Sequence, residues 1–245
     1  MSKILMRVIF LSMLLTLMLS CSKDENKNPT APEKEEPPVF EVQTVTIPTK
    51  MQQSPDPQAQ MVVAYVGMIN SFANFQGLLV PPNTLTKPLA TTDGPSWSYT
   101  WVDQRTGVTV TLTISQTQTH FIWDVVISGE YGGVKVNNWK ILHAERTLNG
   151  DHVVFTIYEV NNTEVAMILE WTNKTDGSSE MIMTVPTEMQ LKVLKNADNS
   201  GSLEYYEWVN NVFVMTFKSD WTATGSGQWW SYNQDGQLKD SGSWG

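Results

Sequence analysis

The stretch PQAQMVVAYVGMINSFANFQGLLVPPNTLT, residues 57–86, decides how this chain folds. It contains no Asp, Glu, Lys or Arg, although these four residue types make up 17% of the chain. Asp56 is placed to cap a helix, and Pro57 then takes the first helical position, where a missing N–H costs nothing. The spacing of apolar residues predicts one long helix over residues 58–79, ended by the prolines that follow it.

The predicted helix has an apolar face and a second face that is small or polar but uncharged. The apolar face carries Met61, Val62, Tyr65, Val66, Met68, Ile69, Phe72, Ala73, Phe75 and Leu79. The second face carries Gln60, Ala64, Gly67, Asn70, Ser71 and Asn74. A helix face in bulk water is normally charged, so this second face is expected to meet protein, a narrow cavity or a ligand. Loops that cover the back of a core helix are one interpretation. The other is a plug or lid at the mouth of a barrel, with the amide-rich strip lining a ligand pocket.

The chain from residue 96 to its end predicts strands, with no second helical period. From residue 96 onwards, short apolar-rich runs are separated by turn dipeptides such as Asn149-Gly150 and Asp235-Gly236. Strands are predicted at residues 40–47, 96–101, 108–115, 121–128, 140–147, 153–160, 165–172, 181–185, 189–194, 203–209, 212–220, 228–233 and 237–244. A long meander leaves two edges to protect. The predicted fold is therefore mainly β, an antiparallel meander closing into a barrel or half-barrel with the N-terminal helix packed in or over it.

Residues 1–20 have the organisation of an export signal, with Lys3 and Arg7 followed by a short apolar core. Cys21, the only cysteine in the chain, comes directly after it. This order resembles a bacterial lipoprotein signal, which implies that Cys21 is lipidated and becomes the mature N-terminus. Ser20 fits the pattern of that family, whereas the two residues before it depart from it. An incidental thiol at the end of a secretory signal is the alternative.

Residues 21–38 are predicted to form a disordered tether, because Pro, Glu, Lys and Asn dominate and almost nothing apolar is present to bury. Its start, Ser22-Lys23-Asp24-Glu25, is similar to the Lys-acid-acid signal that sends some lipoproteins to the cell surface. A plain solvated tether has the same composition. The expected address is therefore the outer membrane, facing the periplasm or the cell surface, with one domain at 39–245.

Composition excludes some partners and chemistries. Cleavage after residue 20 removes two of the 16 basic residues and none of the 25 acidic ones, so the net charge falls from −9 to −11. Such a chain is not expected to bind nucleic acid. The sequence contains no catalytic motif and no metal-binding spacing of His or Cys, so an enzyme and a cofactor are not predicted.

One stretch fits a calcium-binding loop. Asn196, Asp198, Ser200 and Glu207 occupy positions 1, 3, 5 and 12 of that motif, although Asn stands where Asp is preferred. The flanking segments read as strands and not as helices. A polar hairpin turn therefore explains the same residues equally well.

Ten tryptophans indicate either a rich core or surface aromatic residues that stack on ligands. Trp229 and Trp230 must point to opposite faces if they lie in a strand, so one of them is expected to be exposed. At fold level, a helix set against an antiparallel barrel resembles lipocalins and the Lol-type carriers of lipoproteins. The predicted function is a lipid-anchored envelope protein that holds an apolar or amphiphilic ligand in a barrel pocket. The alternative is a surface structural or adhesion module whose exposed aromatic residues contact polysaccharide or protein. A hydrolase with an unmarked carboxylate pair ranks below both.

Overall fold

The structure is a computed structural model that describes residues 38–40, 44–82, 85 and 96–245, without the side chains at 73–76. The predicted signal peptide at 1–20, Cys21 and all but the last residue of the predicted tether at 21–38 lie outside these residues. Within the described part, no helix is both long and apolar enough to cross a membrane.

Twelve antiparallel strands follow one another along the chain, and each is hydrogen-bonded to the strands before and after it. They are β1 (Ser96–Val102), β2 (Thr109–Gln116), β3 (His120–Tyr131), β4 (Val134–Thr147), β5 (His152–Tyr158), β6 (Val165–Asn173), β7 (Ser179–Val185), β8 (Met189–Lys195), β9 (Gly201–Val209), β10 (Val212–Trp221), β11 (Gly227–Tyr232) and β12 (Leu238–Trp244). The predicted antiparallel meander is therefore confirmed. Because β1 and β12 are not hydrogen-bonded to each other, closure into a barrel is not confirmed.

Two compact units divide the chain, and the first contains β1 to β4. In β1, β2 and β3 the buried side chains recur at every second position over most of the strand, which places them on one face of the sheet. Trp97 pairs with Ile114, and Ile114 pairs in turn with Trp123, so large side chains from three strands lie side by side. The ring of Phe40 packs edge-on against Trp123, with centroids 4.8 Å apart.

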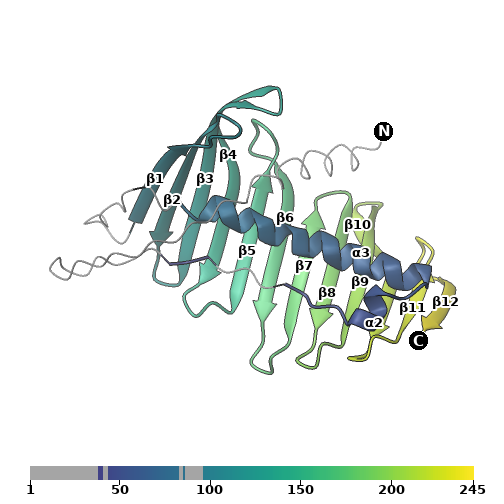
Figure 1. Ribbon diagram of the computed structural model, residues 1–245. Coiled ribbons are helices and arrows are strands. Elements are labelled where there is room, and N and C mark those ends of the chain that lie inside the picture. The colour runs from purple at the N-terminus through teal and green to yellow at the C-terminus, as the bar shows by residue number, and fades with distance from the viewer. Residues whose placement is uncertain (1–37, 41–43, 83–84, 86–95) are drawn as a thin grey trace. The chain divides into compact units, whose positions relative to one another are not determined.

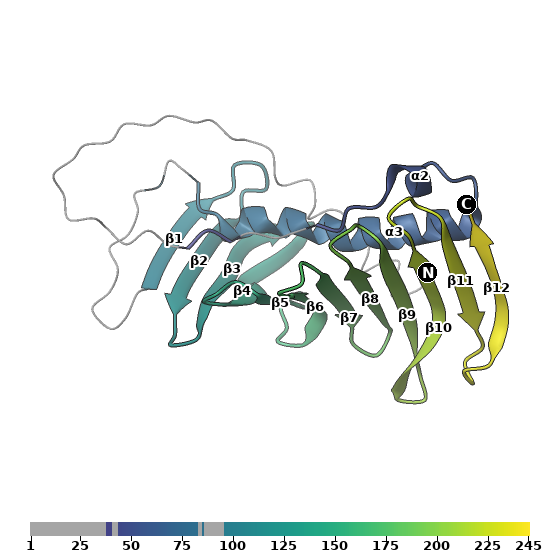
Figure 2. The ribbon, with the colours of Figure 1, turned by 90° about the horizontal axis from the view of Figure 1, so that it is seen from below.

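The second unit contains β5 to β12 and two α-helices, α2 (Thr49–Gln52) and α3 (Pro57–Ser71). Asp56 caps α3 as predicted, because its Oδ1 accepts hydrogen bonds from the backbone N–H groups of Gln58 and Ala59 at 2.8 and 3.0 Å. Figures 1 and 2 both show α3 crossing strands of this unit on one side of them.

The predicted α-helix over 58–79 is too long. The α-helix ends at Ser71, and the residues that follow form a 3₁₀ helix, η2 (Phe72–Leu79). The backbone N–H of Phe72 contacts the carbonyls of both Asn70 and Ile69, which tightens the last turn. Asn and Gly in the segment after Phe72 are weak helix formers, so an apolar periodicity alone was not enough to extend the α-helix.

The predicted first strand at 40–47 is also wrong for its described residues, because residues 44–48 adopt no regular secondary structure. Val45 instead pairs with a side chain of α3: its N–H donates to Oδ1 of Asn70 at 2.8 Å, and its carbonyl accepts from Nδ2 of Asn70 at 2.9 Å. The amide of Asn70 thus replaces a neighbouring strand. This pairing explains how Val45 and Ile47 are buried without belonging to the sheet.

Candidate functional site

In the second unit, the strands bury one face, which we call the inner face; the other is the outer face. The buried inner-face side chains of β6 to β9 are Met167, Leu169, Trp171, Met181, Met183, Met189, Leu191, Val193 and Leu203. Four of these are methionines, whose flexible and polarisable side chains fill irregular spaces and adapt to different contacts. The inner face is therefore apolar and deformable.

Helix α3 meets this face through an aromatic pair. Tyr65 of α3 stacks on Tyr205 of β9, with ring centroids 5.2 Å apart and an angle of 13° between the ring planes. Tyr205 lies two residues after the buried Leu203, so it belongs to the inner face. Both tyrosines are only half-buried. The stack therefore stands at the margin of the inner face, where side chains of α3 and β9 are still accessible.

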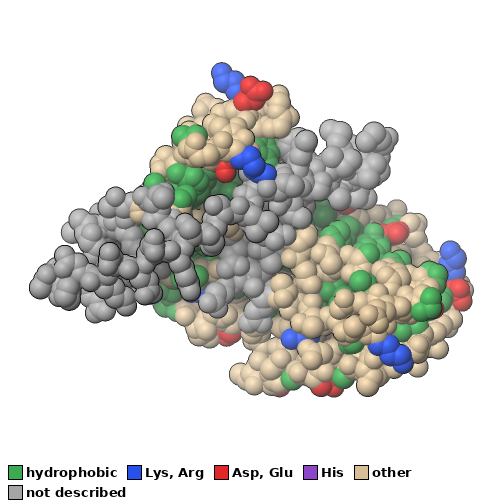
Figure 3. Space-filling model, viewed as in Figure 1, with side chains coloured by type: hydrophobic (Ala, Val, Ile, Leu, Met, Phe, Trp, Pro, Cys, Tyr) green, Lys and Arg blue, Asp and Glu red, His purple; other side chains and the backbone are tan. Residues whose placement is uncertain are grey.

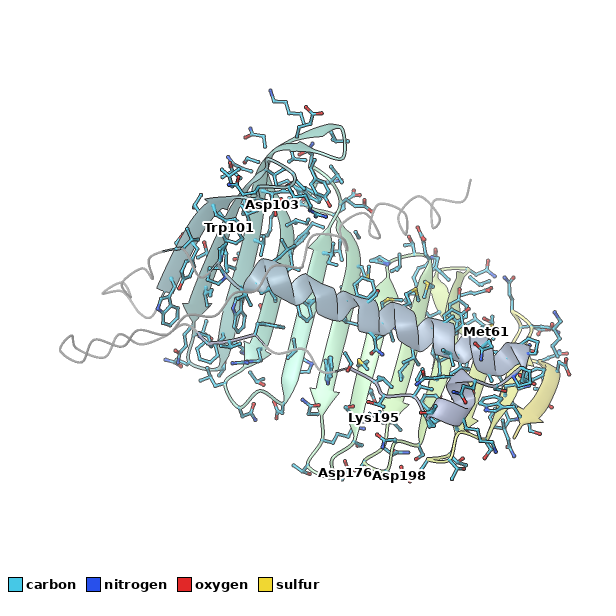
Figure 4. All side chains as sticks on the ribbon, viewed as in Figure 1. Met61, Trp101, Asp103, Asp176, Lys195 and Asp198 are labelled. Carbon is cyan, nitrogen blue, oxygen red and sulfur yellow. The ribbon has the colours of Figure 1, made fainter. Side chains whose placement is uncertain are left out.

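Two methionines flank Tyr65 on the helix. Met61 and Met68 are four residues before and three residues after it, which places them on the same side of α3. Both are half-buried, in contrast to Val62 and Val66, which are completely buried. Figure 4 shows the position of Met61 on α3. In Figure 3 the visible charged side chains of this unit lie mostly towards its rim. The margin of the inner face is thus methionine-rich on the helix side as well.

A single carboxylate borders this margin. Glu207 follows Tyr205 on the inner side of β9 and lies opposite Met189 of β8 and Val214 of β10. Its Oε2 accepts a hydrogen bond from Nε2 of Gln234 at 3.2 Å.

The two tyrosines stay neutral at physiological pH. Burial, then Tyr65 and Glu207, raise the pKa of Tyr205 to about 12. Burial, with a smaller contribution from Glu207, also raises the pKa of Tyr65. The site therefore combines an apolar lining with two neutral hydroxyls and one carboxylate at its edge. Such a combination suits a molecule with an apolar chain and a polar end.

The amide-rich strip predicted to line a pocket contacts the chain itself where the structure describes it. Nε2 of Gln60 donates to the backbone carbonyls of Met51, Gln52 and Ser54 at 3.4, 3.0 and 2.8 Å. The hydroxyl of Ser71 donates to the carbonyl of Met68 at 2.6 Å.

The other members of the strip are placed differently. Asn70 holds Val45, as described above. Gly67 is exposed and has no atom within 4 Å of where a Cβ would stand. The side chain of Asn74 lies outside the described residues. Met61, Tyr65 and Met68 were predicted only as members of the apolar face of the helix. The periodicity of the sequence identifies that face, but it does not show which edge of the face stays half-exposed.

Trp229 and Trp230 point to opposite faces of the sheet, as predicted from the alternation of side chains along a strand. Trp229 is an inner-face residue opposite Ser219 and Gly242, and a Cβ on Gly242 would lie 2.9 Å from the Nε1 atom of Trp229. Trp230 points to the outer face, where Nζ of Lys218 lies 5.9 Å from the centroid of its ring. Only Trp229 can therefore face α3.

The predicted calcium loop is a hairpin turn. Oδ1 of Asp198 accepts hydrogen bonds from the backbone N–H and the hydroxyl of Ser200 at 2.9 and 2.6 Å. Nδ2 of Asn196 donates to the same hydroxyl at 2.9 Å. These bonds to Ser200 lower the pKa of Asp198. Glu207 lies six residues beyond the start of β9, or about 20 Å away at 3.3 Å per residue, so it does not join the other three.

This unit contains four copies of the same turn, including the one at Asp198. In each copy the first residue donates its N–H to the carbonyl of the fifth, and the fourth donates to the carbonyl of the first, at residues 174–178, 196–200, 222–226 and 233–237. The fourth residue has a positive φ each time and is Gly in three copies and Asn199 in the other. Asp176 and Ser178 repeat the side-chain bonds of Asp198 and Ser200, and Figure 4 shows both aspartates at hairpin ends. Turn chemistry therefore accounts for the motif-like spacing.

The first unit contains a cluster of charged groups on its outer side. Nδ1 of His143 contacts Oδ1 of Asp124 at 2.8 Å, Nε2 contacts Oε1 of Glu145 at 2.9 Å, and Lys140 forms an ion pair with Asp124. The hydrogen bond to Asp124 raises the pKa of His143 against the opposing effect of burial. Burial favours a higher pKa for Asp124, but hydrogen bonds from His143 and Lys140 lower it. Among the described residues, no group of three His, Cys, Asp or Glu side chains is arranged to hold a metal ion.

The chain matches no family model, and the search of curated proteins gives no match.

Proposed function

We propose that this chain is a lipid-anchored protein of the cell envelope that holds an apolar or amphiphilic ligand on the inner face of its second unit. The observation that carries the proposal is the half-exposed margin where Tyr65 of α3, flanked on its helix by Met61 and Met68, stacks on Tyr205 of β9, the strand that also bears Glu207. In an ordinary core contact, both side chains are buried. The stack of Tyr65 on Tyr205 instead connects a deformable apolar interior to accessible polar groups.

The many methionines around the inner face support binding of ligands that differ in shape. Methionine side chains have several rotatable bonds and repack around different partners at low cost, which is why they recur at permissive binding surfaces. In this unit they come from both layers: Met61 and Met68 from α3, and Met189 and Met183 from the strands. A ligand chain entering beside Tyr65 would meet these side chains next.

The polar margin supports a ligand with a hydrogen-bonding end. Tyr65 and Tyr205 remain neutral, because burial raises the pKa of both hydroxyls. They can therefore donate to an ester, amide or hydroxyl oxygen. Glu207 accepts hydrogen bonds, which favours a hydroxyl, amide or amine over an anionic group beside it. The ligand class proposed is an apolar chain with a neutral or cationic polar end.

The anchor belongs to the same proposal and rests on the sequence alone. An apolar run preceded by Lys3 and Arg7 and ended by Cys21 supports lipidation at the outer membrane, on its periplasmic or cell-surface side. Residues 22–38 then tether the domain close to the membrane. Lipids and lipid-like molecules are abundant at that position, in agreement with the chemistry of the inner face.

A matched pair of substitutions on α3 tests the ligand site. Met68 borders the inner face, whereas Ala64, on the same helix, is exposed. The probe is N-phenyl-1-naphthylamine, an uncharged dye that fluoresces in apolar surroundings. Met68→Glu is expected to weaken dye binding at least tenfold, because a charge entering the apolar site loses hydration. Ala64→Glu adds the same charge and is expected to leave binding unchanged.

A second variant separates loss of binding from loss of folding. Met68→Gln keeps the side-chain length without a charge, and is expected to fold normally while binding the dye several-fold more weakly. Near-ultraviolet circular dichroism establishes that each variant keeps its tertiary packing. If the parent protein leaves the dye dark, or if Ala64→Glu and Met68→Glu weaken binding equally, the proposed site is wrong.

A further inference from the structure

The outer face of the second unit presents a group of large side chains on three neighbouring strands. Its members, here called the outer aromatic patch, are Tyr206, Trp208, Phe213, Met215 and Trp230. All five are half-buried. The inner core does not need aromatic residues on the opposite face of the sheet. Neighbouring apolar side chains that remain partly accessible commonly mark binding surfaces.

The strand register places these five side chains on one face. Tyr205 faces α3, so its neighbour Tyr206 must face outward, and Trp208 follows two residues later. Tyr206 is opposite Met215, and Trp208 is opposite Phe213. The register of β10 shifts by one residue between Met215 and Phe217, so that Lys218 is the next residue of β10 that faces outward. Lys218 lies opposite Glu204 of β9 and Trp230 of β11. The patch therefore lies on one face of β9, β10 and β11, with Lys218 between Glu204 and Trp230.

Contacts within the patch hold its rings in place. Trp208 and Phe213 pack edge to face, with centroids 4.8 Å apart and an angle of 68° between the planes. Lys218 covers one side of Trp230. The hydroxyl of Tyr206 donates to Oε2 of Glu204 at 2.7 Å. A surface with ordered rings loses little side-chain entropy when a ligand stacks on it.

Polar groups border the rings and leave the patch electrically balanced. Glu204 lies between Lys192 of β8 and Lys218 of β10 in the register, and Lys192 also forms an ion pair with Glu180 at 3.4 Å, so two carboxylates balance the two lysines. Carboxylate and ammonium groups provide acceptors and donors beside the aromatic surface. This combination matches a sugar ring, which has an apolar face of C–H groups and a rim of hydroxyls that need hydrogen-bond partners.

We propose that the outer aromatic patch binds an uncharged polysaccharide, which stacks sugar rings on Trp208 and Trp230 and bonds its hydroxyls to Glu204 and Lys218. The site goes beyond the ligand proposed for the inner face and lies on the opposite side of the same strands. Trp208 lies opposite Phe213 and Trp230 lies opposite Lys218, five residues further along β10, and this separation of the two rings fits an extended chain of sugars.

Two other occupants fit less well. A stable protein interface uses roughly 20–30 residues on each side, far more than the five side chains of the patch. An anionic bilayer would be repelled by a chain whose net charge is −9, and the patch adds no excess of lysine to overcome this. An uncharged glycan requires neither a large area nor a basic surface.

Native electrophoresis of the purified protein in gels containing soluble polysaccharides tests the proposal. The gels contain mixed-linkage β-glucan, xyloglucan or galactomannan, all uncharged, and polygalacturonate as the acidic contrast. At least one uncharged polymer is expected to retard the protein, and polygalacturonate is expected to retard it less. Trp230→Ala and Trp208→Ala are each expected to raise the dissociation constant about tenfold or more, and Tyr206→Phe is expected to raise it less.

The control is Trp229→Phe, which alters the neighbouring tryptophan on the inner face and is expected to leave retardation unchanged. Thermal melting identifies variants that are folded, and Trp230→Gln replaces Trp230→Ala if the latter is not. The proposal is overturned if no uncharged polymer retards the parent, or if folded Trp208 and Trp230 variants are retarded as strongly as the parent. It is equally overturned if these substitutions abolish self-association or vesicle binding while leaving retardation intact. Binding of the naphthylamine dye reports on the inner face, so the two sites can fail separately.

Discussion

Trp221 lies directly opposite Gly201 in the ladder between β9 and β10, and its indole occupies the space that a Cβ on residue 201 would need. Its Nε1 donates to the carbonyl of Asn199 at 3.2 Å. Trp244 covers Gly227 in the same way, and its Nε1 donates to the carbonyl of Gly225 at 2.8 Å. An aromatic ring laid over a glycine in the facing strand recovers the packing that glycine itself lacks.

Two glycine-to-alanine substitutions are expected to change stability in opposite directions. In Gly201→Ala the new methyl group overlaps the Trp221 ring and the carbonyl of Leu194, so the free energy of unfolding should fall by about 1–3 kcal/mol. In Gly67→Ala the methyl group enters open space on an exposed helix position, so that free energy should rise by about 0.5–1 kcal/mol. Urea denaturation monitored by tryptophan fluorescence measures both. If Gly201→Ala is as stable as the parent or more stable, the Trp221–Gly201 packing does not limit stability.

The His143 cluster is expected to make stability depend on pH. The folded pKa of His143 is raised, so its contribution is fully present below the unfolded value of about 6.5 and is lost as the pH rises through the folded pKa. The folded pKa of Asp124 is lowered, so its contribution is present above about 3.9 and is lost as the pH falls through the folded pKa. The cluster therefore stabilises most between these limits.

The variant His143→Gln separates the cluster from other effects of pH. The difference in melting temperature between the parent and this variant should be largest near pH 5 to 6 and should shrink above neutral pH. Nuclear magnetic resonance titration of the His143 ring gives its pKa directly. A difference that stays constant from pH 5 to pH 9 would contradict the assignment.

Asp198 and Asp176 are expected to behave alike, because they make the same bonds in two copies of one turn. Asp198→Ala and Asp176→Ala should lower the melting temperature by similar amounts. Millimolar calcium should leave the melting temperature of the parent and of both variants unchanged. A calcium-dependent rise that disappears only in Asp198→Ala would restore the calcium loop.

Cys21→Ala is expected to give an exported but unlipidated protein. The parent should partition into the detergent phase of Triton X-114 and incorporate labelled palmitate, and the variant should do neither. A Ser22→Ala control should behave as the parent does. If the Cys21→Ala protein still sediments with outer membranes after a carbonate wash, another part of the chain is the anchor.

Strand positions were predictable because side-chain burial in a sheet repeats every second residue, a period that the sequence displays directly. All twelve strands from Ser96 to Trp244 were anticipated within three residues at each end, except that β4 begins at Val134, six residues before the predicted start. The helix start was equally clear, since Asp56 and Pro57 act through local bonds and backbone geometry. Its end was not, because the apolar pattern continues past Ser71 while the backbone tightens into η2.

The candidate site was only partly predictable. The helix that bears it and the opposite orientations of Trp229 and Trp230 followed from periodicity. The stack of Tyr65 on Tyr205 did not, because it joins residues 140 positions apart in sequence, and no local pattern specifies which strand a helix will cross. The same holds for Asn70, whose amide was expected to face a ligand and instead completes the backbone pairing of Val45.

By itself, the sequence determined that the chain is a β meander with one capped helix, because periodicity, caps and turns depend on neighbouring residues. Tertiary structure alone decided that the sheet is not closed by hydrogen bonds, that one flank of α3 is half-exposed beside β9, and that five large side chains share the outer face of β9 to β11. These outcomes depend on register and on contacts between distant segments. A shift of one residue in register would exchange the two faces of a strand without changing its sequence pattern.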